Sequence, residues 1–315
     1  MAAQTEAVAV RVQGRSSVGA WFRKYRFQLA LITPLVAYVL VFTVAPIIDT
    51  FRLSFTAPRG ETFGTVQNYS AVFENAVFRE AVVNTVIVAL LSLALEIGVG
   101  LTVALALHTP FRGRGFARTV VLVPLGVPTI VSGAVMLLIF SRSGYLNSVT
   151  LWFAELISKI PGINWDFHPI GLTVAGGWKT LFIVAIADMW KVLPVMVLIF
   201  LAGLQSLPED IYEAADVDGA TKWQRFWKIT LPLLVPYITM AIILRAIDAF
   251  RIFELALVLA GGIEPVLGTF IANRYLPPTN DPFTAASASI VLFGIIMVFI
   301  VLYLRFVAVR GEVQR

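Results

Sequence analysis

The stretch that decides the fold is YEAADVDGATKWQRFWKITLPLLVP, residues 212–236. Its first part is polar and rich in residues that cap helices, yet it lies between two long hydrophobic segments of the chain. A polar segment in that position has to leave the hydrophobic surroundings of its neighbours and face water. We expect contact with a partner protein to be the reason for its pattern.

Capping residues predict a short helix at the start of this region. Ser206 and Glu209 have the spacing of a capping box, and Pro208 suits the first turn of a helix. Gly219 is a typical residue at a helix C-terminus, because it adopts the left-handed backbone conformation easily. The sequence therefore predicts a helix that Ser206 caps and Gly219 ends.

A second short helix is predicted directly after the first one. Thr221 and Gln224 repeat the capping-box spacing, and Pro232 and Pro236 are expected to mark the next helix boundary. Together the two helices form a helix–turn–helix segment, residues 206–230. Small side chains would let a partner backbone approach, and carboxylates would bind its Arg or Lys residues. The small residues are Ala214, Ala215 and Ala220, and the carboxylates are Glu213, Asp216 and Asp218.

Composition indicates a membrane protein. Of the 315 residues, 58% are hydrophobic and 14% are charged, against about 45–50% and about 25% in soluble domains. Six stretches approach or exceed the length of about 20 apolar residues that a helix needs to cross the hydrocarbon core. These stretches are Phe27–Ile48, Ala81–Leu107, Thr119–Ser141, Leu181–Leu204, Leu233–Leu259 and Phe283–Leu304. We predict an all-α membrane protein with six transmembrane helices.

The basic residues predict the orientation. An even number of spans puts both termini on one side, and segments on that side hold 14 of the 24 Lys and Arg residues, against seven on the other. Basic residues in short loops favour the cytoplasmic side. We therefore expect both termini and the helix–turn–helix segment to be cytoplasmic. This topology accounts for the net charge of +5 without a nucleic-acid partner.

The predicted fifth span carries an unusual series of charges. Arg245, Asp248, Arg251 and Glu254 alternate in sign at three-residue steps. Each step turns about 60° around a continuous helix, so neighbouring members can pair. Charges inside a membrane usually face the bundle interior or a wet cavity. The series can line a polar path or form an internal ion-pair ladder, and the sequence leaves both open.

Two other predicted spans add polar candidates. Asp188 and Lys191 can pair at i, i+3 in the fourth span, beside Trp190, whose ring suits the apolar face of a sugar. The same ring can also pack within the bundle. Glu96 is a single carboxylate in the second span, and it can be protonated, paired with an arginine of span five, or exposed to a cavity. The candidate path residues are Glu96, Asp188, Trp190, Lys191, Asp248 and Arg251.

Several classes of chemistry are not expected. The chain has no cysteine, and its two histidines fall on opposite sides of the predicted membrane. Neither histidine has a second ligand at a metal-binding spacing, so we predict no metal site and no catalytic residues. Gly14 and Gly19 have the spacing of a phosphate loop, but Ala20 and Trp21 replace its Lys and Ser or Thr. We therefore predict no nucleotide cofactor in this chain.

The helix–turn–helix segment resembles the EAA signature of permease subunits of bacterial ABC importers. The matching residues are Glu213-Ala214-Ala215, Asp218-Gly219-Ala220, Ile229 and Leu231-Pro232. Flanking residues are similar to those of the carbohydrate-uptake branch, the maltose, trehalose and glycerol-phosphate type. These flanking residues are Trp190, Lys191, Pro194, 202–204, 207–208 and 248–253. The resemblance extends from about Phe27 to the C-terminus.

The resemblance implies a role and partners. Glu213, Ala214, Ala215, Asp218, Gly219 and Ala220 would belong to a cytoplasmic coupling helix, between spans four and five, that docks into an ATPase subunit. Two ATPase subunits would bind the ATP and Mg²⁺, beside a second homologous permease and an extracytoplasmic solute-binding protein. The chain would be no enzyme but half of a path for a sugar or polyol across a bacterial inner membrane. It lacks the extra N-terminal spans and large outer insert of the larger maltose-type subunits, which leaves open how a binding protein docks.

The same resemblance sets the expected domains. Residues 1–26 would be a cytoplasmic segment whose basic and aromatic end, Trp21 to Arg26, meets membrane lipid. Residues 27–309 would be the transmembrane domain, with the coupling loop at 205–232, and 310–315 a cytoplasmic tail. An importer for a non-sugar solute and a membrane enzyme acting on lipid-linked sugars are the alternative functions.

Overall fold

The structure is a computed structural model that describes residues 18–57, 60, 62–160, 168, 171 and 176–313. Within these ranges the chain is helical, and the only extended pairing is an isolated bridge between Thr56 and Phe63. The α-helices are α1 (Val18–Val39), α2 (Ala45–Ser54), α3 (Gln67–Glu74), α4 (Ala76–His108), α5 (Arg114–Leu122), α6 (Thr129–Phe140), α7 (Tyr145–Ser158), α8 (Trp178–Gln205), α9 (Glu209–Val217), α10 (Lys222–Arg225), α11 (Leu231–Phe250), α12 (Glu254–Ala260), α13 (Leu267–Tyr275) and α14 (Pro282–Val313).

The prediction of an all-helical protein with six membrane spans is confirmed. Six helical stretches of the described chain are long and apolar enough to cross a membrane. They are Lys24–Ser54, Ala76–His108, Thr129–Ser158, Trp178–Gln205, Lys222–Phe250 and Pro282–Val307. By internal contacts the chain divides into two units, Met1–Thr50 and Phe51–Arg315. The predicted domain boundaries at residues 26 and 309 stay predictions.

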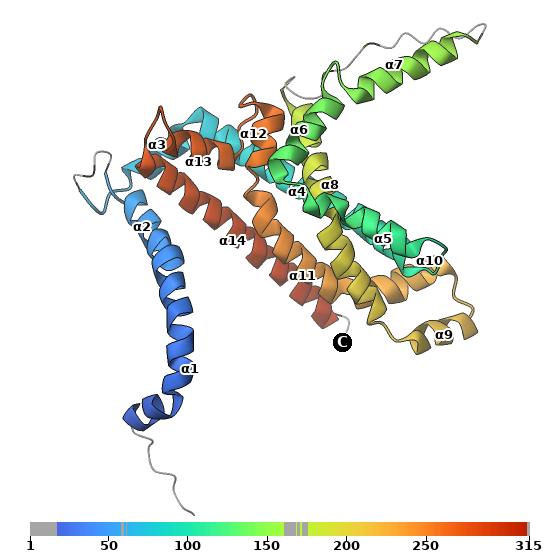
Figure 1. The fold of residues 1–315 in the computed structure, drawn as a ribbon, viewed down its shortest axis with the longest axis horizontal. Helices are drawn as coiled ribbons and strands as arrows, with labels where there is room; N and C mark the ends of the chain where they lie inside the picture. The colour runs from blue at the N-terminus through green and yellow to red at the C-terminus, as the bar shows by residue number, and fades with distance from the viewer. Residues whose placement is uncertain are drawn as a thin grey trace, which may run out of the picture. The chain divides into compact units, whose positions relative to one another are not determined.

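Helix α4 is central to the second unit, where it packs along α8, α11 and α13 (Figure 1). Three clusters of buried apolar side chains hold these helices together, and each includes residues of α4. Helices α8 and α11 approach closely at Gly203, where an added Cβ would lie 2.7 Å from Cγ of Tyr237. Gly203 is therefore required for packing, because any larger residue would push the two helices apart.

The predicted third span, Thr119–Ser141, is wrong as a continuous helix. Helix α5 ends at Leu122, a 3₁₀ turn follows at Val123–Gly126, and α6 begins at Thr129. Pro124 and Pro128 explain the break, because proline donates no backbone hydrogen bond and disfavours a helical residue before it. The candidate crossing segment then continues to Ser158 through α7.

The predicted fifth span, Leu233–Leu259, is also wrong at both ends. Helical structure starts at Lys222, passes through Pro232 and Pro236, and ends at Phe250. A π-helical turn at Phe226–Thr230 ends two residues before Pro232, and another at Leu40–Val44 ends two residues before Pro46. Such wider turns relieve the clash between a proline ring and the preceding carbonyl groups. The prolines therefore modify this helix instead of ending it.

Candidate functional site

The helix–turn–helix segment begins differently from the prediction. Pro208 occupies the N-cap position of α9, and no side chain caps that helix. The Ser206 hydroxyl instead donates to the carbonyl oxygen of Gly203 at 2.7 Å and lies 2.7 Å from the Tyr237 hydroxyl. Ser206 therefore closes the last turn of α8, whose terminal carbonyl groups lack partners within the helix. The predicted Ser206–Glu209 capping box is wrong.

The turn and the second helix follow the prediction. Gly219 has φ +73°, the left-handed conformation expected of a glycine that ends a helix. The N–H groups of Gly219 and Ala220 donate to the carbonyl oxygens of Asp216 and Ala215 at 3.1 and 2.9 Å. Thr221 and its partner three residues later form both hydrogen bonds of a capping box. The tight reversal after α9 is therefore held by backbone geometry and by this cap.

The segment offers a polar surface with an apolar tip. Glu213, Ala214, Asp218 and Gly219 are exposed and Ala220 is half-buried, whereas Ala215 is buried in the chain's own packing. Ala215 therefore has no surface to offer a partner. Val217 is 89% exposed between two aspartates. Val217 was not among the predicted contact residues.

An ion pair joins the two helices of the helix–turn–helix segment. Nη1 of Arg225 donates to Oδ1 of Asp216. The hydroxyls of Tyr212 and Thr230 lie 3.0 Å apart and also join the two arms. Oδ1 of Asp216 therefore has a partner within the chain, but the side chain is 61% exposed, and its contact with a partner protein stays a prediction. Glu213 and Asp218 are in no ion pair within the described residues.

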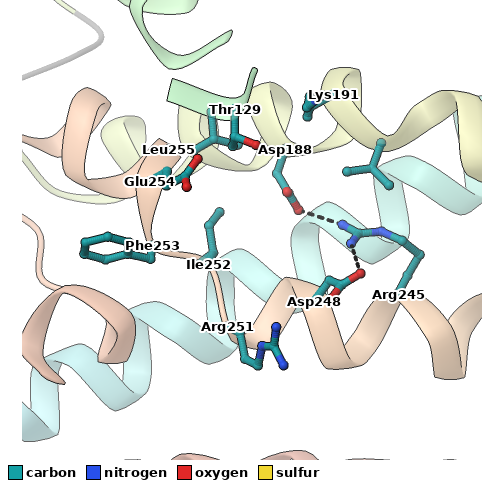
Figure 2. A pocket seen from close by; sticks show the side chains of 11 residues that line it. Thr129, Asp188, Lys191, Arg245, Asp248, Arg251, Ile252, Phe253, Glu254 and Leu255 are labelled. Carbon is teal, nitrogen blue, oxygen red and sulfur yellow. Dashed lines mark hydrogen bonds and ion pairs between the residues drawn. The ribbon is translucent and has the colours of Figure 1, made fainter. Parts of the chain in front are cut away.

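A second group of candidates meets at one arginine inside the bundle. The guanidinium of Arg245 donates to both carboxylate oxygens of Glu96, at 2.9 and 2.7 Å, and to Asp188 at 3.1 Å. Its third nitrogen lies 3.6 Å from the carboxylate of Asp248. Figure 2 shows the carboxylates of Asp188 and Asp248 on two sides of this guanidinium. The cluster joins α4, α8 and α11, and breaking such a buried pair costs about 3–5 kcal/mol.

Lys191 has a different partner from the one predicted. Its ammonium donates to the carbonyl oxygens of Pro124 (2.9 Å), Leu125 (3.3 Å) and Val127. These carbonyl groups lie at the break in the third span, where the Pro124 carbonyl also accepts the N–H of Val127 at 3.2 Å. The predicted Asp188–Lys191 pair is wrong, because the broken helix offers Lys191 three acceptors. The sequence PLGVP, residues 124–128, was the signal for this break.

The predicted series of charges along span five does not lie on one helix. Helix α11 ends at Phe250, Arg251 occupies its C-cap, and Glu254 starts α12. Within the described residues neither Arg251 nor Glu254 is in an ion pair. Of the neighbouring pairs that the spacing allows, Arg245–Asp248 is therefore confirmed and Asp248–Arg251 is not formed.

These charges border a cleft of about 350 Å³ (Figure 2). Its lining residues are Thr129, Asp188, Lys191, Val192, Arg245, Asp248, Arg251, Ile252, Phe253, Glu254 and Leu255. Of the six predicted path residues, four line this cleft and two do not. Glu96 lies behind Arg245 with no exposed surface, and Trp190 packs, half-buried, against a hydrophobic cluster of α6, α8 and α12. Thr129 and Phe253 were missed, because their proximity depends on two helix breaks.

The cleft brings together groups suited to a polyhydroxylated molecule. Asp188 and Asp248 supply acceptors and Arg245 and Arg251 supply donors, while the Lys191 ammonium is already directed at three backbone carbonyl groups. The half-buried ring of Phe253 adds an apolar surface beside them. An arrangement of this kind can bind and orient a polar solute, and the described part of the cleft holds no cysteine or histidine nucleophile–base pair.

Sequence comparisons identify related proteins. Residues 96–309 match the family described as binding-protein-dependent transport system inner membrane component. The trehalose/maltose transport system permease protein MalF of Thermococcus litoralis is 36% identical over 293 residues, covering 90% of this chain and 94% of that protein. The trehalose permease SugA of Mycobacterium tuberculosis is 32% identical over 78% of this chain and 77% of its own length. The sn-glycerol-3-phosphate permease UgpA of Brucella abortus is 29% identical over 89% and 94%.

Solved structures share the fold. A chain of a bacterial ABC transporter involved in the import of the acidic polysaccharide alginate superposes with a TM-score of 0.76 at 21% identity, over 90% of this chain and 96% of that chain. The alginate transporter in complex with an alginate pentasaccharide-bound periplasmic protein gives 0.78 at 20% identity, over 91% and 95%. The resemblance predicted from the EAA residues is confirmed. The chain belongs to the family of binding-protein-dependent transport system inner membrane components.

Proposed function

We propose that this chain is one of two permease subunits of an ABC importer that carries a neutral sugar or polyol into the cell. The observation that carries the proposal is the match, over 90% of the chain, to a permease named for trehalose and maltose. The charged cleft is consistent with such a solute. Its three acidic side chains, Asp188, Asp248 and Glu254, balance its three basic side chains, so a neutral solute fits it without leaving a net charge.

The exposed helix–turn–helix segment is the docking site for an ATPase subunit in this proposal. Its ends are continuous with α8 and with the helical stretch 222–250, which also carry the cleft residues Asp188 and Arg245. A displacement of the segment can therefore reach the cleft through two helices, without a flexible linker between them. The basic-residue count supports a cytoplasmic position for the segment and for both termini.

The remaining subunits follow from the same proposal. A second homologous permease completes the path, two ATPase subunits bind ATP and Mg²⁺, and a binding protein delivers the solute from outside. The alginate transporter is described in complex with a periplasmic protein, which supports the last of these partners by analogy.

The test is transport by the purified complex. The tagged chain is purified from native membranes, its partners are identified by mass spectrometry, and the complex is reconstituted into vesicles. ATP-dependent uptake is then measured for trehalose, maltose, glycerol phosphate, an acidic oligosaccharide and a peptide. We expect uptake of a neutral sugar or polyol only. Uptake of the peptide alone, or turnover of lipid-linked sugars without ATPase subunits, would refute the proposal.

A further inference from the structure

Three carboxylates surround the guanidinium of Arg245, but their distances from its nitrogens differ. Glu96 takes the Nε–Nη2 edge of Arg245 with two short hydrogen bonds, and Asp188 shares Nη2 at 3.1 Å. Nη1 lies 3.6 Å from Asp248, which is too long for a hydrogen bond. The strongest contact of Arg245 is therefore made with the carboxylate that lies deepest in the bundle.

Burial separates these carboxylates into two kinds. The Glu96 side chain is fully buried on α4 and does not line the cleft. The Asp248 side chain is 59% exposed and does line it. Arg245 contacts both of them, and only 3% of its side chain is exposed. Arg245 therefore connects Glu96, which lies outside the cleft, with Asp248, which lines it.

We infer that Glu96 is a positioning residue, which holds Arg245 back from Asp248 and so keeps the Asp248 carboxylate available to solute hydroxyl groups. A guanidinium presents its donors in a rigid planar fork, so a partner on one edge fixes the direction of the other edge. The described surroundings offer Arg245 no fourth carboxylate. Without the charge of Glu96, the guanidinium turns toward Asp188 and Asp248 and occupies their oxygens.

This inference rests on the proposed function, because it concerns solute binding in the cleft. The positioning role of Glu96 differs from that of a purely structural ion pair and from that of a residue that lines the path. A purely structural role would lower the amount of assembled complex and leave the KM of that complex unchanged. A positioning role raises the KM for the solute while the maximal rate per complex is retained.

The experiment compares Glu96→Gln with Thr85→Val in reconstituted complex. Thr85 is also fully buried on α4, three turns away, where it accepts a hydrogen bond from the N–H of Leu267. We expect Glu96→Gln to raise the KM about fivefold or more, with a maximal rate within about twofold of the unmodified protein. Thr85→Val should lower the yield of complex without changing the KM. An unchanged KM in Glu96→Gln, or an equal rise in Thr85→Val, would overturn the inference.

A double-mutant cycle tests the route of the effect. If Glu96 acts through Arg245 on Asp248, Glu96→Gln should add almost nothing to the KM of Asp248→Asn. Additive effects of the two changes would overturn the route. Should Glu96→Gln not assemble, Arg245→Lys is measured instead, because lysine keeps the charge but lacks the planar fork. It should raise the KM comparably, and an unchanged KM would again refute the inference.

The proposed function and this inference can fail separately. Absence of uptake for every sugar and polyol by the unmodified complex would remove the proposed function itself. A raised KM in Asp248→Asn combined with a normal KM in Glu96→Gln would leave the cleft as the solute site. It would show that Glu96 has no part in preparing that site.

Discussion

Substitutions at Gly219 test whether the shape of the turn after α9 determines docking. Gly219 has φ +73°, and a Cβ added there would meet nothing within 4 Å. The cost of a side chain is therefore the cost of the left-handed backbone alone, about 1–2 kcal/mol for an ordinary residue. A β-branched residue lies at the upper end, and asparagine tolerates this conformation. Because each 1.4 kcal/mol is a factor of about ten, the native turn is disfavoured roughly tenfold to thirtyfold by valine.

The expected result is a graded loss of coupling. Gly219→Asn should retain most ATPase docking, Gly219→Ala should lose part of it, and Gly219→Val should lose about tenfold or more. Docking is measured by titrating purified ATPase subunits onto the reconstituted permease, with membrane abundance followed by immunoblot. Gly98→Val is the control, since Gly98 is an exposed glycine within α4 with equal free space around it. Docking equally weak in Gly219→Asn and Gly219→Val would refute the backbone argument.

Three further predictions concern charge, orientation and the cleft. Glu213→Arg should weaken ATPase docking roughly tenfold or more, because it reverses an exposed charge, and normal co-purification would contradict this. In intact cells an impermeant thiol reagent should label Thr279→Cys but not Val217→Cys, and the reverse pattern would invert the topology. Asp248→Asn should raise the KM for the solute about tenfold with normal assembly. Trp190→Ala should instead lower the yield of complex, because removal of the half-buried ring costs folding stability on the order of 2 kcal/mol. A raised KM at full yield would indicate that Trp190 lines the solute path.

The sequence was sufficient wherever a local rule governs the structure. Gly219 and Thr221 adopt the turn and the capping box predicted from their types and spacing, because both features depend on residues within five positions. The six spans follow from hydrophobic length in the same way. Ser206 was misassigned because two helix ends compete for its hydroxyl. The sequence shows both possibilities, and only the structure shows that the Gly203 carbonyl receives it.

Proline was the main source of wrong boundaries. Pro232 and Pro236 were predicted to end a helix, yet the π-helical turn before them lets the helix continue. Pro124 and Pro128 do interrupt one, and Lys191 then donates to carbonyl groups at the interruption. The rule that proline removes a hydrogen bond holds at all four positions. What differs is whether a wider turn or a side chain compensates, and this depends on neighbours distant in sequence.

The partners of the buried charges depend on how each helix is rotated about its own axis. Glu96 and Arg245 are 149 residues apart, so no local rule relates them. Helix α4 is apolar around its whole circumference, and its hydrophobic residues do not indicate which face is inward. Its polar residues do, because Thr85, Ser92 and Glu96 lie at i, i+7 and i+11 and are all fully buried. This stripe could have predicted that Glu96 faces the bundle. The choice of Arg245 could not be predicted, since it requires α4, α8 and α11 to present three carboxylates to one guanidinium at the same depth.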